Sequence, residues 1–531
     1  MRNVGAATEF DVVVIGGGVN GLVCAALLAQ AKRRVVVVEA MGRTGGACQT
    51  NDVVAGHRVS TFAHLIGPLD AQVVKALKLA RHGLNFTAKQ ISTVALSPEG
   101  RHIVLDGDLR HTTQSLSAHS QNDAKAWAPF DTRMAKIAGQ LQRWVQTPPG
   151  GAFEQATRGG SLFATRPTAR AGAALDAEFG ALLDGSIGEL LDAEFETPLL
   201  KGAIAFDGIV GSAVSPRTQG TAFVAALRAA LEAEAPDGIV HPQGGAGAFA
   251  SALQKAAEAA GVSIRLNARV TNLLFENGRT TGVALAGGQA IYAPIVVSSM
   301  NAKATLIGLG AERYLPLGLK RRLSGFRAEG CVAKVNLALA SLPSFKGLDK
   351  RHLKERLLIC PSIDHLDRAF AAYEQGTFSP DPALEITIPS THDASLATPG
   401  QHVLSAHVLY VPKTPAAGAW TDATKKDLIA AVGSTLRQYS PDLPELILGA
   451  DLYTPADVES MGGTPGGHWH GGDLTLDQLG PLRPMAGMSR YDTPIAGLFL
   501  CGAGTHPCGG VTGINGRIAA EAVLAGAPVT A

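Results

Sequence analysis

Near its N-terminus the chain carries two short apolar runs that do not alternate with polar residues. Asp11–Ile15 (DVVVI) and Val35–Val38 (VVVV) are rich in β-branched residues, which predicts strands buried on both faces of a parallel sheet. Gly16–Gly21 follows the first run, and the Ala- and Leu-rich segment Leu22–Ala31 then predicts a helix. Glu39 directly follows the second run. Strand, glycine turn, helix, strand and acid in this order are typical of a dinucleotide-binding βαβ unit.

The glycine turn and the acid each suit one part of a dinucleotide. Gly16 permits the tight turn, Gly18 lets the backbone approach a pyrophosphate, and Gly21 lets the helix pack close to the strand. The start of the helix offers free N–H groups and a partial positive charge, which suit phosphate. Glu39 can accept hydrogen bonds from ribose hydroxyls. The alternative is a glycine-rich turn without a ligand, and the pattern alone leaves NAD and FAD open.

The rest of the chain alternates further short apolar runs with helical segments. A hairpin is expected at Val270–Phe275 and Thr281–Ala286, around Glu276-Asn277-Gly278. Further strands are expected at Val262–Leu266, Ile295–Ser298 and Leu498–Cys501, and helices at Gly180–Phe195, from Phe249 to about Ala260 and from about Val511 to Ala525. We predict an α/β protein with a Rossmann-type cofactor domain formed by residues 1–84, 235–311 and 460–531. An α+β substrate domain, a mixed sheet plus helices, is interleaved with it at residues 85–234 and 312–459.

Composition and charge exclude several classes of protein. Lys and Arg total 46 and Asp and Glu total 45, so the formal net charge of +1 argues against a nucleic-acid binder. With 46% hydrophobic and 17% charged residues, the chain is not expected to be disordered, and its 62 glycines lack the three-residue period of collagen. No apolar run reaches the roughly 18–20 residues of a membrane span. Met1–Phe10 has no signal-peptide core, so a cytoplasmic location is expected.

Neither a metal site nor a redox dithiol is expected. The six cysteines show no C-x-x-C spacing, and Cys48 has no partner cysteine four or five residues away. His468 and His470 flank Trp469 in a glycine-rich loop, but two histidines at this spacing lack the further ligands that a metal needs. Packing of the loop, or an entrance to a substrate channel, is the expected role of this segment.

Three widely separated regions resemble one known family. These regions resemble the cofactor-binding segments of the FAD-dependent amine-oxidase superfamily. They are Glu39–Ala47 (EAMGRTGGA), the hairpin that starts at Val270, and Leu498–Arg517. Within that superfamily the chain is most similar to the phytoene-desaturase-like branch, and especially to its pyridine nucleotide-disulphide oxidoreductase domain-containing subgroup. This closer similarity is carried by Gly466–Gly471, Leu476–Leu479 and Leu482–Pro484. The resemblance covers nearly the whole chain and is more specific for FAD than for a substrate.

The resemblance implies FAD as the cofactor, with the flavin carrying the hydride or electron chemistry. Arg43 could meet a phosphate of the FAD or could be a solvated loop arginine. If the last helix starts at Gly509–Val511, its positive end would face the pyrimidine end of the flavin and stabilise the reduced anion. Besides Gly16, Gly18, Gly21 and Glu39, the residues expected to bind FAD are Gly45, Gly46, Val270 (through its main chain, at the adenine), Gly502, Gly504, Gly510 and Val511.

Four residues are candidates for the chemistry: Lys334, His506, His64 and Cys508. Alternation places Lys334 and Asn336 on one face of an expected strand. Lys334 resembles the amine-oxidase lysine that holds a water near flavin N5, while the alternative is a lysine on the solvent face of an edge strand. His64 would face the other side of the flavin from the final loop, which contains His506 and Cys508. Cys508 could touch the isoalloxazine, attach it covalently, or be an inert small residue.

Three functions remain open on the sequence. The first is an FAD-dependent oxidoreductase that desaturates or dehydrogenates a small apolar substrate, carotenoid-like or isoprenoid, by hydride transfer to the flavin. The second is a flavin amine oxidase, which Lys334 favours and which the 5% aromatic content disfavours. The third is a non-catalytic FAD-binding interaction protein. No nucleic-acid partner is expected, whereas peripheral membrane contact and a homo-oligomer stay open.

Overall fold

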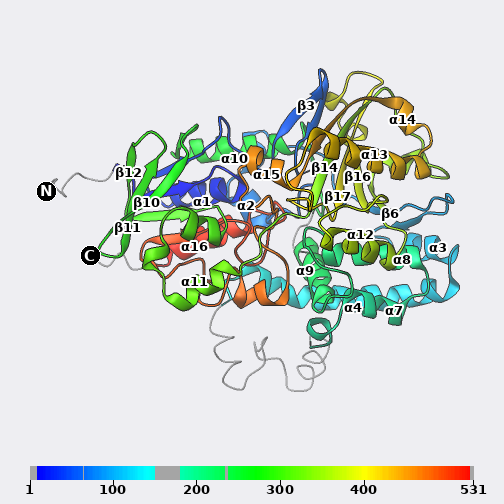
Figure 1. The fold of residues 1–531 in the computed structure, drawn as a ribbon, viewed down its shortest axis with the longest axis horizontal. Helices are drawn as coiled ribbons and strands as arrows, with labels where there is room; N and C mark the ends of the chain where they lie inside the picture. Colours follow the sequence, from blue (N-terminus) through cyan, green and yellow to red (C-terminus); the bar gives the residue numbers. More distant parts are fainter. Residues whose placement is uncertain (1–8, 64, 150–179, 234–236, 527–531) are drawn as a thin grey trace.

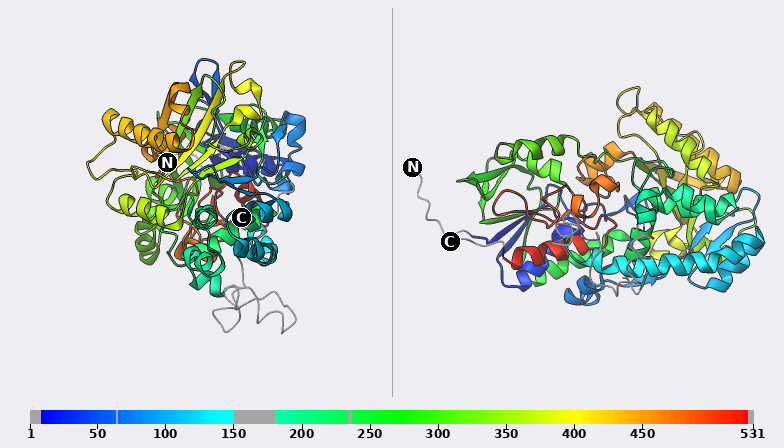
Figure 2. Two further views of the ribbon diagram at one scale, coloured as in Figure 1. Left: turned by 90° about the vertical axis from the view of Figure 1, so that its right-hand side faces the viewer. Right: turned by 90° about the horizontal axis from the view of Figure 1, so that it is seen from below.

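Two large sheets lie side by side along the long axis of the molecule (Figure 1). The computed structural model describes residues 9–63, 65–149, 180–233 and 237–526 of the 531-residue chain. The small sheet of β10 (Val270–Glu276), β11 (Arg279–Leu285) and β12 (Ala290–Tyr292) lies at one end of the long axis and α3 (Leu109–Ser117) at the other. In Figure 1 and in the right-hand view of Figure 2, the orange segment that contains α15 (Pro455–Gly462) lies between the two sheets.

The first sheet has five strands, and all its pairings are parallel. Its strands come from three separate regions of the chain, and their order across the sheet is β19 (Leu498–Leu500), β13 (Ile295–Ser298), β1 (Val12–Ile15), β2 (Val35–Val38) and β9 (Ser263–Arg265). The parallel strands expected from the unbroken apolar runs are therefore present, and the predicted Rossmann-type α/β fold is confirmed.

The valine runs avoid polar alternation because each strand face meets its own hydrophobic core. Val12 and Val14 of β1 pack in the same cluster as α1 (Val19–Gln30) and α16 (Ile514–Leu524). Val13 and Ile15 pack in the cluster that contains the three-stranded sheet. Both faces of the strand are thus removed from water, which is the usual reason for such runs in parallel sheets.

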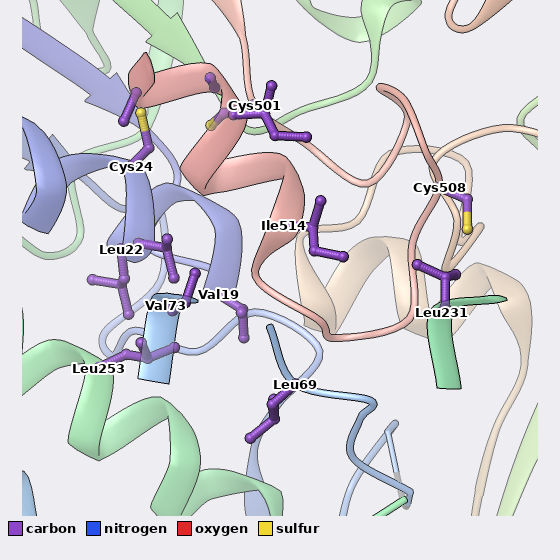
Figure 3. Packing of buried hydrophobic residues seen from close by; sticks show 14 of the residues in the cluster. Val19, Leu22, Cys24, Leu69, Val73, Leu231, Leu253, Cys501, Cys508 and Ile514 are labelled. Atoms are coloured by element: carbon purple, nitrogen blue, oxygen red, sulfur yellow. The ribbon is translucent and has the colours of Figure 1, made fainter. Parts of the chain in front are cut away.

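Two helices cover one face of this sheet in close mutual contact. Figure 3 shows Cys24 of α1 beside Cys501, which directly follows β19. It also shows Leu22 of α1 and Ile514, the first residue of α16, in the same cluster. Nine of the twelve residues of α1 are buried, so the helix is apolar on almost every side. A Cβ on Gly516 would lie only 2.3 Å from the Asn20 carbonyl oxygen, so glycine is what allows α1 and α16 to approach this closely.

The expected hairpin is confirmed as part of a three-stranded antiparallel sheet. β10 (Val270–Glu276) pairs with β11 (Arg279–Leu285), which pairs with β12 (Ala290–Tyr292). Asn277 and Gly278 both have positive φ, 49° and 75°, which is what a two-residue hairpin turn requires.

The second sheet has seven strands, and its register decides the surroundings of Lys334. Its order is β18 (Ile447–Tyr453), β14 (Val332–Leu339), β17 (His402–Leu409), β16 (Leu384–Thr387), β15 (Arg356–Ile359), β6 (Thr93–Ala95) and β7 (Ile103–Leu105). β14 is an internal strand whose eight residues are all buried. The alternative of an exposed lysine on an edge strand is therefore wrong, because β18 covers what would have been the open edge.

Helices cover both faces of the second sheet. α13 (Asp422–Tyr439) packs with alternate residues of β14–β17 on one face, and α8 (Pro198–Ile209) and α12 (Ile363–Glu374) pack on the other (Figure 1). The remaining elements are α2 (Ala71–Ala76), α4 (Gln121–Gln146), α7 (Ile187–Glu194), α9 (Thr221–Ala233), α10 (Ala246–Ala259), α11 (Leu317–Ser324), α14 (Leu443–Leu446), β3 (Thr50–Val54), β4 (His57–Ser60), β5 (Phe86–Ala88) and β8 (His241–Pro242). The exact limits of the two domains stay a prediction.

The segment Gly180–Phe195 forms two helical pieces rather than the single one expected. Ser186 interrupts it with extended backbone and accepts from the Glu189 N–H, while the Glu189 carboxylate accepts from the Ser186 N–H. This capping box starts a new helix, α7, because it satisfies N–H groups that have no partner inside the helix.

Substituting Gly516 tests the close approach of α1 and α16. We expect Gly516→Ala to lower the free energy of unfolding by about 2 kcal/mol or more, because the new methyl group overlaps the Asn20 carbonyl. The matched control is Gly139→Ala in α4, where a Cβ meets nothing within 4 Å. This control should raise stability by about 0.5–1 kcal/mol, as expected in an exposed helix interior. Urea unfolding followed by circular dichroism measures both, and equal effects would contradict the packing described.

Candidate functional site

Two glycine segments meet at the end of β1 and leave an open backbone surface. Gly16 has a φ of 93°, and its N–H donates to the Val38 carbonyl (2.9 Å), which joins the turn to β2. Gly18 forms a bridge with Gly45, and a Cβ on Gly18 would find only the Gly46 Cα, 3.9 Å away. The protein itself therefore does not fill the space beside Gly18, as expected where backbone approaches a phosphate.

Glu39 is fixed beside this turn by backbone hydrogen bonds. Its Oε2 accepts from the Gly17 N–H (2.7 Å) and its Oε1 from the Met41 N–H (2.8 Å). Glu39 is buried, yet it lines the same cavity as Gly16 and Gly18. The carboxylate is thus held in place at the end of β2, where the βαβ unit positions its ribose-binding acid.

A single large cavity, which we call the central cavity, connects the two sheets. One part of its lining comes from the ends of β1 and β2, and another from β14, β16 and β17. Nine of the twelve residues expected to bind the cofactor line it, namely Gly16, Gly18, Glu39, Gly45, Gly46, Val270, Gly504, Gly510 and Val511. Segments from both ends and the middle of the chain are therefore brought together, as a bound dinucleotide would require.

The other three expected cofactor residues do not line the central cavity. A Cβ on Gly21 would lie 2.1 Å from the Gly16 carbonyl oxygen, and one on Gly502 would lie 2.2 Å from that of Ser299. These two glycines allow the chain to pack against itself. Arg43 is exposed and donates to the Gln49 side chain (2.6 Å), which favours the alternative of a loop arginine.

The final helix begins later than expected, which corrects the argument about its positive end. α16 starts at Ile514, after Gly513, whose φ of 81° makes a left-handed turn. Val511 also has a positive φ, 62°, so it cannot belong to the first helical turn. Val511 therefore reaches the cavity as part of a loop, and the helix N-terminus lies beyond it.

Arg483 holds this C-terminal wall together, a role that its place in the sequence did not reveal. Its side chain is fully buried, and burial lowers its pKa to about 10. The guanidinium donates to the carbonyl oxygens of His470, Gly472, Asp473, Gln478, Ala503 and Thr505. It thereby joins the loop that carries Trp469 to the loop that carries Gly504, and both loops line the central cavity.

The four candidates for chemistry are only partly brought together. Lys334 and Cys508 both line the central cavity. The Cys508 thiol is buried and donates to the Gly509 carbonyl (3.2 Å), and burial raises its pKa, so it is not a thiolate. His506 does not line the cavity: its Nε2 contacts the Trp144 carbonyl (2.7 Å) and its ring packs edge-on against the Trp144 indole. His64 lies outside the described residues.

Lys334 is buried in a charged environment that the sequence did not indicate. Its side chain is 2% exposed, and burial lowers its pKa well below the ordinary lysine value. Within the described residues, its Nζ forms no hydrogen bond. Its neighbour His407, on β17, contacts Glu385 through Nδ1 (2.8 Å), and Glu385 accepts from the Nε of Arg356 (2.6 Å). A buried, charged cluster therefore adjoins the cavity.

The histidines that flank Trp469 differ in their surroundings. His468 Nδ1 accepts from the His470 N–H (3.1 Å), so its Nε2 donates to Asp473 (3.0 Å). The ring nitrogens of His470 form no hydrogen bond within the described part of the chain, although the ring is buried and lines the cavity. Burial lowers the pKa of His470 well below its ordinary value, so the ring is neutral. Among the described residues, no cluster of His, Cys, Asp or Glu could hold a metal ion.

The cysteines of the described chain are all free and buried. Cys501 contacts Cys24 behind the first sheet (Figure 3), and this contact raises the pKa of Cys501 well above its ordinary value. Neither residue lines the central cavity. The thiols that do line it, Cys48 and Cys508, have pKa values raised by burial, which disfavours dithiol chemistry there. No described helix combines the length and the apolar character needed to cross a bilayer.

Comparisons with known proteins agree with this site. Residues 14–78 match the family model described as an NAD(P)-binding Rossmann-like domain. Over 97% of its length the chain is 32% identical to pyridine nucleotide-disulfide oxidoreductase domain-containing protein 2 of Rattus norvegicus, of which the match covers 93%. It is 27% identical to a limonene dehydrogenase subunit of Castellaniella defragrans, covering 97% of this chain and 94% of that protein. It is also 27% identical to the lycopene-forming phytoene desaturase of Pseudescherichia vulneris, covering 54% and 56%.

A solved structure shows the same fold. Putrescine oxidase with bound putrescine superposes with a TM-score of 0.62 at 16% identity, covering 97% of this chain and 99% of that one. Together, the comparisons confirm the resemblance to the pyridine nucleotide-disulfide oxidoreductase domain-containing subgroup and to phytoene desaturases, and the likeness to the amine oxidase is one of fold.

Gly18 offers a test of the dinucleotide site that does not depend on turnover. Because the protein leaves the space beside Gly18 open, we expect Gly18→Ala to change the free energy of unfolding of the cofactor-free chain by less than about 1 kcal/mol. The same substitution should reduce the dinucleotide released per chain on heat denaturation at least about tenfold. Thermal unfolding and chromatography of the released nucleotide measure the two effects. Retention of a full dinucleotide complement would show that the ligand does not approach Gly18.

Proposed function

The chain belongs to the family of pyridine nucleotide-disulfide oxidoreductase domain-containing protein 2, and from that membership we propose an FAD-dependent oxidoreductase that dehydrogenates an apolar, isoprenoid-like substrate by hydride transfer to the flavin. A limonene dehydrogenase subunit, a phytoene desaturase and putrescine oxidase, to which it is similar, are oxidoreductases, and its own candidate dinucleotide site opens into the central cavity.

The residues present suit FAD as the dinucleotide. The open backbone at Gly18, the fixed carboxylate of Glu39 and the residue Val270 line one continuous cavity. These residues would hold the pyrophosphate, the ribose and the adenine in turn. When bound, the flavin supplies a two-electron acceptor for a hydride.

One observation carries the substrate class: an apolar wall adjoins the cofactor residues in the same cavity. Val332 of β14 and Leu474 contribute to this wall, and so do Val210, Leu227 and Leu231 from α9 and the end of α8. All five of these aliphatic residues are more than nine-tenths buried. Apolar surface of this kind binds hydrocarbon by removing it from water and excludes water from the reacting atoms. The names of two relatives, a limonene dehydrogenase subunit and a phytoene desaturase, are those of enzymes acting on isoprenoids.

A flavin amine oxidase is the second candidate, because Lys334 and two aromatic side chains line the cavity. These aromatics have other partners, however. Phe62 packs edge-on against Tyr453, and Trp469 packs against the His407 ring. Arg228, which lines the same cavity, is paired with Asp207 (3.4 Å), and Glu232 lines the cavity as well. The arrangement therefore favours a neutral, apolar substrate.

Stopped-flow reduction of the bound flavin separates the candidate functions. We expect members of an isoprenoid panel to bleach the flavin absorbance at least about tenfold faster than members of an amine panel, because the apolar wall binds hydrocarbon and the aromatic rings of Phe62 and Trp469 are packed against other rings. Faster bleaching by amines would establish the second candidate. Bleaching by neither panel, in a protein that carries a full complement of FAD, would favour a non-catalytic FAD-binding protein.

A further inference from the structure

A row of ionisable side chains crosses four strands of the seven-stranded sheet. In the register of this sheet, Lys334 of β14 lies opposite Tyr453 of β18 on one side and His407 of β17 on the other. His407 in turn lies opposite Glu385 of β16. Directly opposite residues in antiparallel strands project from the same face. Lys334, His407 and Glu385 therefore stand in line, and all three line the central cavity.

The hydrogen bonds of His407 fix the number of protons in this row. Its Nε2 lies 3.0 Å from the Phe62 carbonyl oxygen, which can only accept, so Nε2 carries a proton. Its Nδ1 lies 2.8 Å from Glu385 Oε2. A hydrogen bond at this distance needs one further proton, either on Nδ1 or on the carboxyl group. Glu385 and His407 therefore share one proton beyond that of a neutral imidazole and a carboxylate.

A buried arginine places this shared proton on His407. Glu385 Oε1 accepts from Arg356 Nε at 2.6 Å, and Arg356 also donates to both carboxylate oxygens of Asp207 (2.7 and 3.2 Å). Arg356 is 3% exposed, so its charge acts on Glu385 with little screening by water. This guanidinium favours the ionised carboxylate, and the proton then resides on the imidazole.

The positive charge of His407 acts on Lys334, its neighbour across the strand pair. Two charges of the same sign this close repel strongly in a buried site. Burial, and after it the charge of Lys334, lower the pKa of His407 overall, and the hydrogen bonds to Glu385 and Phe62 offset only part of that shift. Among the described residues, the other ionisable side chains that line the cavity are Glu39, Cys48, Arg228, Glu232, Arg269, His468, His470 and Cys508. Tyr453 on β18 lies opposite Lys334.

We propose that Glu385 and His407 hold one proton beside Lys334, and that the resulting positive charge keeps the Lys334 amine neutral so that it accepts the proton released by substrate dehydrogenation. The last step rests on the proposed function. One hydrogen would leave the substrate as a hydride, with both electrons of its C–H bond, and a bound flavin would accept it. The other leaves as a proton, which bonds to Lys334 Nζ, and the electron pair that it leaves behind forms the new double bond. His407 and Glu385 act through Lys334 and are positioning residues.

Chemical labelling measures the charge of Lys334 without any turnover. Only a neutral amine reacts with formaldehyde, so the pH at half-maximal reductive methylation, read by mass spectrometry of the peptide that contains Lys334, reports its protonation in the protein as purified. We expect this midpoint to lie below that of the exposed Lys426. His407→Gln should raise it by about one to two pH units, because the positive charge is lost and Glu385 stays ionised. Glu385→Gln, which removes both charges, should raise it by a smaller amount.

A buried histidine outside the cavity provides the matched control. His365 of α12 is 2% exposed and does not line the central cavity, so His365→Gln should leave the midpoint of Lys334 unchanged. The order wild type, Glu385→Gln, His407→Gln supports the proposal. Equal midpoints in these three proteins would overturn it. A midpoint of Lys334 equal to that of Lys426, or no labelling at any pH, would also overturn it, because proton acceptance needs a neutral and reachable amine.

The pH dependence of flavin reduction gives the second readout. The neutral amine is lost as pH falls, so the rate constant of flavin reduction should drop below the labelling midpoint of Lys334. In His407→Gln this drop should move to higher pH by about one to two pH units, as the labelling midpoint does. A shifted labelling midpoint with an unshifted rate profile would overturn the proton-accepting role. If no substrate reduces the flavin, the proposed function fails, while the labelling series still decides the charge of Lys334.

Discussion

The C-terminal wall of the central cavity depends on one buried guanidinium. Arg483 donates to six backbone carbonyls in two segments that do not pair with each other as strands. Hydrogen bonds from a charged donor stabilise by roughly 1.5–3 kcal/mol each, and a buried carbonyl without a donor costs a comparable amount. Gly471 approaches Gly504 so closely that a Cβ on Gly471 would lie 2.5 Å from the Gly504 nitrogen. The guanidinium thus replaces the strand pairing that the two loops lack.

The glycines around the cofactor-binding sheet include two physical kinds. At Gly21, Gly502 and Gly516, an added Cβ would meet a carbonyl oxygen at 2.1–2.3 Å, so the protein itself occupies the space. At Gly18, an added Cβ would meet only the Gly46 Cα, and the free space belongs to the cavity. The first kind lets strands, turns and helices pack against one another. The second kind leaves backbone exposed to a ligand, and only this kind argues for a cofactor.

Local patterns predicted much of the first sheet, because its strands are short apolar runs buried on both sides. Val35–Val38 and Ile295–Ser298 have the bounds expected, and the turn at Asn277 and Gly278 follows from local backbone preferences. The start of the last helix could not be predicted in this way, since apolar Val511 resembles a helical residue but takes a left-handed conformation. The position of the His506 ring could not be predicted either, because its contact with Trp144 joins residues far apart in the sequence.

The charged cluster shows most clearly why tertiary pairing limits such predictions. Alternation places Lys334 and Asn336 on one face of a strand, but it says nothing about the strands on either side. Glu385 and His407 reach Lys334 only through the pairing of β16, β17 and β14. Such a cluster is costly to bury, and its ion pairs alone give little net stability. Removing a proton from a hydrocarbon in a dry cavity, however, requires a base that is neutral without water around it. The apolar wall on one side of the cavity excludes water, and the charged row on the other side would keep the Lys334 amine neutral.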